Sequence, residues 1–89
     1  MTLGSVLRLG EKVLDLRIER GLTQMQLAAQ AGLGHSFITA LETGRKRYVR
    51  AEEVEALALG LGVEPEELWG AIPARDGGKG GYIPLHAAA

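Results

Sequence analysis

The chain has 89 residues, with ten Lys and Arg, eleven Asp and Glu, two His and no Cys, and a formal net charge of −1. This length fits one small domain, and the lack of thiols excludes a disulfide framework and a thiolate metal site. No stretch reaches the ~20 apolar residues that span a bilayer. The first residues also lack the basic start and long apolar run of a signal peptide. We therefore expect a cytoplasmic protein that makes no membrane contact.

Apolar periodicity predicts short helices and no strands along the first 70 residues. Leu9, Val13 and Leu16 recur at helical spacing and mark the first helix, which Gly21 ends. The second helix opens at Thr23 and ends near residue 32. It begins with a capping box, because a glutamine stands three residues after Thr23.

The remaining helices follow the same logic. We expect a third helix over residues 35–43, a fourth over 51–61 and a short fifth that begins at Pro65, a residue favoured in the first turn of a helix. The predicted fold is a compact all-α bundle of five helices over residues 5–73. Residues 74–89 form a Gly-rich linker and an apolar tail, which we expect to be flexible unless the tail docks on something.

The second and third predicted helices form a helix-turn-helix candidate. Gly32, Leu33 and Gly34 join them, and Gly32 tolerates the left-handed backbone that such a turn needs. Ala28 is small enough to let the two helices cross closely. The second helix of the pair can then present one polar face to the major groove of DNA, which is wide enough for an α-helix.

Four blocks occur in order between Leu16 and Leu68: LRIERGLTQMQLA, AGLG, ITALETGR and ALALGLGVEPEEL. With them the chain resembles the repressor/Cro family of helix-turn-helix regulators, also described as Xre-type or Cro/C1-type. The resemblance implies a transcriptional regulator, more often a repressor, that binds double-stranded DNA. It also implies a homodimer on a palindromic operator, with no cofactor and no enzymatic activity.

The resemblance also implies which residues contact the bases. His35, Ser36 and Ala40 match base-reading positions, and Thr39 lies on the same face. His35 and Ser36 can exchange hydrogen bonds with base edges, whereas Ala40 offers only a methyl group, for instance to thymine. Because this surface offers few groups that can bond to base edges, we expect part of the sequence preference to come from DNA shape.

Phosphate contacts are implied for polar residues on either side of these positions. Thr23 and Gln24 open the second helix, where backbone N–H groups favour anions. Thr43 matches a further phosphate-contact position. The best candidates for phosphate or minor-groove contacts after it are Arg45, Lys46, Arg47 and Arg50, in a loop that departs from the family pattern because it lacks the common proline. The alternative is that this basic run and the glutamates of residues 52–67 are merely solvated faces of opposite charge.

Other residues are expected to be structural. Arg17 and Glu42 match a pair that forms a buried ion pair in similar proteins, and Phe37 is expected to pack beneath the basic run. His35 and His86 have no acidic neighbours at metal-ligand spacing, so no metal site is expected. Adjacent residues on a helix do not face each other, which argues against catalysis by His35 and Ser36.

The partner surface and the tail leave alternatives open. Leu68, Trp69 and Ile72 are candidates for a homodimer interface, although Trp69 could equally pack in the core. A protein-interaction module of the antitoxin type is the main competing function, with an unknown protein partner on the acidic segment. A third hypothesis is that the chain is the DNA-binding part of a longer self-cleaving repressor, because residues 82–89 resemble the start of its cleavage domain.

Overall fold

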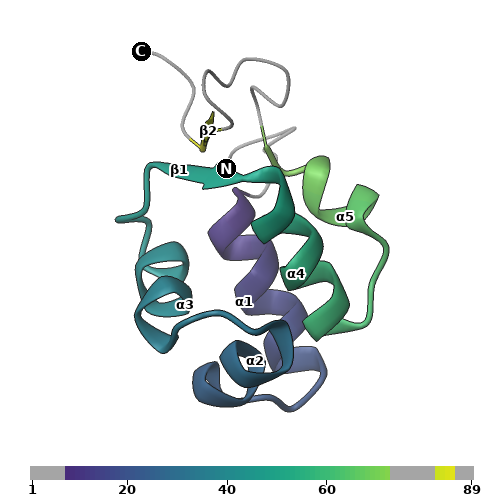
Figure 1. Ribbon diagram of the computed structural model, residues 1–89. Coiled ribbons are helices and arrows are strands. Elements are labelled where there is room, and N and C mark those ends of the chain that lie inside the picture. Colours follow the sequence, from purple (N-terminus) through teal and green to yellow (C-terminus); the bar gives the residue numbers. More distant parts are fainter. Residues whose placement is uncertain (1–7, 73–81, 86–89) are drawn as a thin grey trace, which may run out of the picture.

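The computed structural model describes residues 8–72 and 82–85, and within these ranges the fold is mainly helical. The helices are α1 (Leu9–Glu19), α2 (Gln24–Ala31), α3 (His35–Glu42), α4 (Ala51–Leu61) and α5 (Pro65–Trp69), arranged as in Figure 1. The predicted five-helix fold is confirmed, and the ends of α2 and α4 agree with the sequence prediction.

Local sequence explains where α2 begins and ends. The Thr23 Oγ1 accepts the Gln26 N–H at 3.0 Å, and the Gln26 side-chain oxygen accepts the Thr23 N–H at 2.8 Å. This reciprocal pair is the predicted capping box. At the other end Gly32 adopts φ 70° and ψ 30°, a left-handed conformation that stops the helix.

One aliphatic core joins all five helices. α2 packs against α3 and α4, while α1 contacts α3, α4 and α5. The side chains that are almost completely buried come from each helix and from the segment after α3: Leu9, Val13, Leu27, Ile38, Leu41, Val49, Val54, Leu57, Leu61 and Leu68. Burial of these residues turns the opposite, polar side of α3 outward.

Gly10 allows α1 to approach the end of α3 closely. A Cβ atom at this position would collide with the backbone carbonyl oxygen of Leu41. Since a backbone oxygen cannot move aside as a flexible side chain can, only glycine fits here. The close approach sets the position of α3 on the rest of the domain.

Two short strands correct the prediction that the chain contains none. β1 (Tyr48–Arg50) pairs antiparallel with β2 (Tyr82–Pro84), and Val49 stands opposite Ile83. Ile83 and Leu85 are buried in the core. The apolar tail therefore docks on the helical domain through residues 82–85, which is the exception that the sequence analysis left open for the tail. A strand of three residues is too short to show an alternating pattern in the sequence.

The remainder of the predicted linker and tail, at 74–81 and 86–89, lies outside the described residues, and so does His86. The same applies to residues 5–7 and 73 of the predicted domain. Within the part of the chain that the structure describes, no helix is both long enough and apolar enough to cross a membrane.

The predicted dimer residues require a second correction. Leu68 and Ile72 are 0% and 3% exposed, and both belong to the core. They pack inside the domain because α5 lies against α1 and α4. Of the three candidates, only the half-buried Trp69 keeps exposed surface, and it also packs against the core.

Candidate nucleic-acid interface

The turn between α2 and α3 has the geometry that the sequence predicts. After the left-handed Gly32, the Leu33 N–H returns to the Ala28 carbonyl at 2.9 Å. Gly34 then has extended backbone angles and accepts the Phe37 N–H at 3.1 Å, which starts α3. Ala28 is buried beneath the turn, as expected of a small residue at a close crossing.

α3 has one buried and one outward side. Ile38 and Leu41 face the core. The outward side carries the four residues predicted to contact bases, of which two are exposed and two half-buried. We call this set the α3 face; it consists of His35, Ser36, Thr39 and Ala40. None of the four is acidic, so the face carries no charge that would repel DNA.

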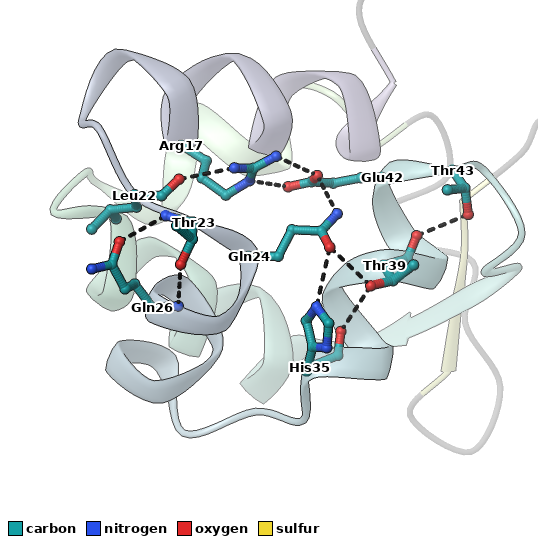
Figure 2. Close-up of polar contacts among 9 residues, drawn as sticks. All are labelled: Arg17, Leu22, Thr23, Gln24, Gln26, His35, Thr39, Glu42 and Thr43. Atoms are coloured by element: carbon teal, nitrogen blue, oxygen red, sulfur yellow. Dashed lines mark hydrogen bonds and ion pairs between the residues drawn. The ribbon is translucent and has the colours of Figure 1, made fainter.

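A largely buried ion pair ties α1 to α3. The Arg17 Nε and Nη2 donate to the two carboxylate oxygens of Glu42 at 2.7 and 2.9 Å, and Nη1 donates to the Leu22 carbonyl at 2.8 Å (Figure 2). The side chains of Arg17 and Glu42 are 14% and 4% exposed. The hydrogen bond to Glu42 raises the pKa of the Arg17 guanidinium, although burial opposes the change. The predicted structural pair is confirmed.

Gln24 extends this pair to the α3 face. Its Nε2 donates to Glu42 at 2.9 Å, and its Oε1 accepts the Thr39 hydroxyl at 3.1 Å and lies 3.2 Å from His35 Nε2 (Figure 2). The sequence analysis missed this role, since no sequence spacing reveals that α2 crosses α3 at these residues. Since one hydrogen on the Gln24 Nε2 is donated to Glu42, a contact with phosphate would have to use the second hydrogen on this nitrogen.

The threonines predicted to contact phosphate also have bonds within the protein. The Thr23 Oγ1 accepts a bond in the capping box, which leaves its hydroxyl hydrogen available to an outside acceptor. The Thr43 hydroxyl donates to the Thr39 carbonyl at 2.8 Å, so it would have to rotate to bind phosphate. Of the two, Thr23 is better prepared to hold an anion.

The basic run begins directly beside the α3 face. We call residues 45–50 the basic loop. The backbone N–H groups of Arg45 and Lys46 both donate to the Ala40 carbonyl, at 2.9 and 3.0 Å. In the middle of the loop, the Arg47 carbonyl accepts the Leu85 N–H at 2.9 Å. The loop is therefore held by α3 on one side and by the docked tail on the other.

The four cations of this loop fall into two groups. The Lys46 ammonium lies 4.6 Å from the centre of the Phe37 ring, and the Arg50 guanidinium lies 4.9 Å from that of Tyr82. Arg50 also lies 3.8 Å from a Glu52 oxygen. These contacts confirm that Phe37 packs beneath the loop, and they show a partner for Arg50 that sequence analysis missed.

Arg45 and Arg47 form the second group. Both are exposed, and neither has an ion pair or ring contact with another residue in the ranges 8–72 and 82–85. They are the cations best placed to meet an external phosphate. No group of three or more His, Asp or Glu side chains in these ranges could hold a metal ion.

Two short helices at a glycine turn, the second with a polar outward face and a basic loop after it, define a helix-turn-helix protein. A family model described as helix-turn-helix domain matches residues 8–69. The chain belongs to this family, and its fold places it among the repressor/Cro-type DNA-binding transcriptional regulators predicted above.

Solved structures of this type resemble the chain along most of their length. The restriction-modification controller protein C.AhdI from Aeromonas hydrophila is 35% identical with a TM-score of 0.64, over 67% of this chain and 89% of its own. The hypothetical transcription factor NHTF from Neisseria is 28% identical with a TM-score of 0.64, over 75% of this chain and 85% of its own.

SinR, a master regulator for biofilm formation that was solved in complex with DNA, is 23% identical with a TM-score of 0.65. The match covers 68% of this chain and 97% of that one. At this identity the likeness concerns the fold alone. The comparison with curated proteins found no match.

Proposed function

We propose that the protein is a homodimeric repressor that binds a palindromic DNA operator, with the α3 face in the major groove. The observation that carries this proposal is the arrangement of that face. Its four small or polar side chains point away from the core, and Gln24 and the Arg17–Glu42 pair hold two of them through hydrogen bonds. Arg45 and Arg47 follow in the basic loop, and neither has an ion pair with another residue in the described ranges.

In this proposal the base contacts and the phosphate contacts come from different segments. His35, Ser36, Thr39 and Ala40 meet base edges, which specify the sequence. The phosphate contacts come from Thr23, Gln24, Thr43 and the basic loop, and they set affinity and orientation. Within the loop, Arg45 and Arg47 contribute most, because Lys46 and Arg50 already lie over aromatic rings.

Dimer formation would place two α3 helices on successive turns of one side of the duplex. The half-sites would then lie about 34–36 Å apart, as for other proteins of this architecture. Trp69 is our candidate for the dimer surface, because it is the one predicted residue on α5 that keeps exposed area. The proposal includes a cytoplasmic location.

Similar proteins support this direction. C.AhdI is a restriction-modification controller, and SinR was solved with DNA bound. Their particular targets do not carry over to this chain, because an operator is specified by the few residues on the α3 face.

The experiment is a selection from a random-sequence duplex pool, followed by titration of the selected duplex at about 50 and about 200 mM salt. The protein is compared with the Arg45→Ala/Arg47→Ala variant. We expect a palindrome to be enriched and its affinity to fall steeply with salt. Each phosphate contact contributes about 0.9 to the slope of log affinity against log salt, so the double variant should show a slope shallower by about 1.8.

Arg20→Ala is the matched control, because this exposed arginine lies at the end of α1 and pairs with Glu19 at 3.6 Å. It should leave the slope almost unchanged. Weak binding without enrichment, together with no loss in the double variant, would contradict the proposal. That result would favour the protein-interaction alternative on the acidic segment.

A further inference from the structure

The orientation of the Gln24 side-chain amide follows from its neighbour on α3. Glu42 presents a carboxylate, which can only accept hydrogen bonds, and one of its oxygens lies 2.9 Å from the Gln24 amide. That oxygen also accepts from Arg17 at 2.9 Å, which holds the carboxylate in place. The amide nitrogen of Gln24 must therefore face Glu42, and its oxygen must face α3.

This orientation decides which nitrogen of His35 carries hydrogen. The Gln24 Oε1 can only accept, and it lies 3.2 Å from His35 Nε2 (Figure 2). A hydrogen bond between them requires a hydrogen on Nε2. The Thr39 hydroxyl also lies within hydrogen-bond distance of the same oxygen, at 3.1 Å, and its one hydrogen can alternatively bond to the His35 carbonyl at 3.3 Å.

The other ring nitrogen is then available to a ligand. His35 is exposed, and its Nδ1 forms no hydrogen bond with any residue in the ranges 8–72 and 82–85. In a neutral imidazole with hydrogen on Nε2, Nδ1 is purely an acceptor. A ring held in this form can bond only to a group that offers a hydrogen.

We propose that Gln24 is a positioning residue that fixes the tautomer of His35 and so determines which bases His35 selects. With Nδ1 as acceptor, neutral His35 favours a base whose major-groove edge carries an amino group. Those bases are adenine, through N6, and cytosine, through N4. Guanine offers only acceptors at N7 and O6 and is disfavoured. The inference rests on the proposed function, since it requires that the α3 face contact bases.

The first arm of the test needs no DNA. Nitrogen-15 NMR of the histidine rings distinguishes the two neutral tautomers, recorded at about pH 8, where a histidine ring is ordinarily neutral. Wild-type protein should show His35 with hydrogen on Nε2 alone. Gln24→Met keeps the length of the side chain but removes both polar ends, and it should give a mixture of tautomers. Gln30→Met is the matched control, because Gln30 is an exposed glutamine on the same helix.

The second arm measures base preference by selection from the random duplex pool at the same pH. We expect one position in each half-site at which wild type and Gln30→Met prefer adenine or cytosine over guanine by roughly five- to tenfold, the scale of a single base contact. Gln24→Met should reduce that preference severalfold, and His35→Ala should abolish it. Thermal unfolding of each variant checks that the domain remains folded.

The outcomes separate the inference from the function on which it rests. Hydrogen on Nδ1 in the wild-type spectrum would overturn the tautomer assignment. A guanine preference that His35→Ala removes would overturn the base selection while leaving the DNA-binding function intact. Absence of any selected sequence, with the Nε2 tautomer confirmed, would refute the proposed function and the base preference together.

Discussion

The helix-turn-helix segment and the basic loop reach their geometry by different routes. α2 and α3 are defined by nearby residues: a capping box at Thr23, a left-handed turn at Gly32, and a polar network that begins at Gln24. The basic loop instead depends on a distant segment, because Tyr82 and Leu85 contact it from the docked tail. The comparison indicates that the α3 face, which we propose contacts bases, is positioned within the helical part of the domain. The basic loop, which we propose contacts phosphate, is positioned in part by the C-terminal strand.

The two regions also differ in their polar contacts. The side chains around Glu42 form hydrogen bonds in a largely buried network, and no buried side-chain polar atom among the described residues lacks a partner. The loop cations are exposed or lie over rings. Variants in the first region should therefore affect stability, and those in the second should mainly affect the loop and its ligand.

The largest effect should come from Glu42→Ala. This change leaves the largely buried Arg17 guanidinium without its carboxylate and removes the Glu42 partner of Gln24. We expect the free energy of unfolding to fall by about 3–5 kcal/mol, measured by urea denaturation. The control is Glu19→Ala, which breaks an exposed pair with Arg20 and should cost less than about 1 kcal/mol. Equal losses in the two variants would show that the Arg17 pair is not effectively buried.

A smaller effect is expected from Ile83→Ala in β2. Ile83 is 6% exposed and stands opposite Val49. Loss of its buried methyl groups should cost about 2 kcal/mol. It should also loosen the tail, so that hydrogen exchange of the Leu85 amide, which bonds to Arg47, becomes faster. The exchange of amides within α3 should change little; if α3 and Leu85 were to exchange faster by the same factor, the two regions would be one unit.

The smallest of the three effects should come from Gly32→Ala. The left-handed φ of 70° strains any side chain, so we expect a loss of about 1 kcal/mol in thermal or urea unfolding. Gly70→Ala is the control, because Gly70 has φ −63° and a Cβ there would meet only ordinary contacts. It should be neutral or slightly stabilising. A Gly32 variant as stable as the Gly70 variant would mean that the turn does not require a left-handed residue.

Sequence analysis succeeded where short-range signals decide the structure. Apolar spacing and terminal glycines predicted the helices, since each described glycine with positive φ stands where a helix or its capping turn ends. The resemblance to the repressor/Cro family supplied the Arg17–Glu42 pair, which no spacing rule would have found. The α3 face is outward as expected, because Ile38 and Leu41 take the buried side.

Prediction from the sequence failed where segments far apart in the chain meet. The three residues of β2 carry no recognisable sequence pattern. This segment is held in place because Ile83 and Leu85 are buried in a core formed mainly by helices that precede it in the chain. The same long-range packing buried Leu68 and Ile72, whose apolar character suits a core as well as a dimer surface. The link from Gln24 to His35 was also missed, because it depends on how two helices cross.

The most direct test of the account compares the base preferences of two double variants with wild type in one selection from random duplexes. His35→Ala/Ser36→Ala alters the α3 face, and Arg45→Ala/Arg47→Ala alters the loop. We predict that the first changes the preferred sequence within each half-site, whereas the second lowers affinity for all sequences and keeps the preference. An unchanged preferred sequence in the His35/Ser36 variant, at wild-type affinity, would contradict the claim that α3 is the recognition helix.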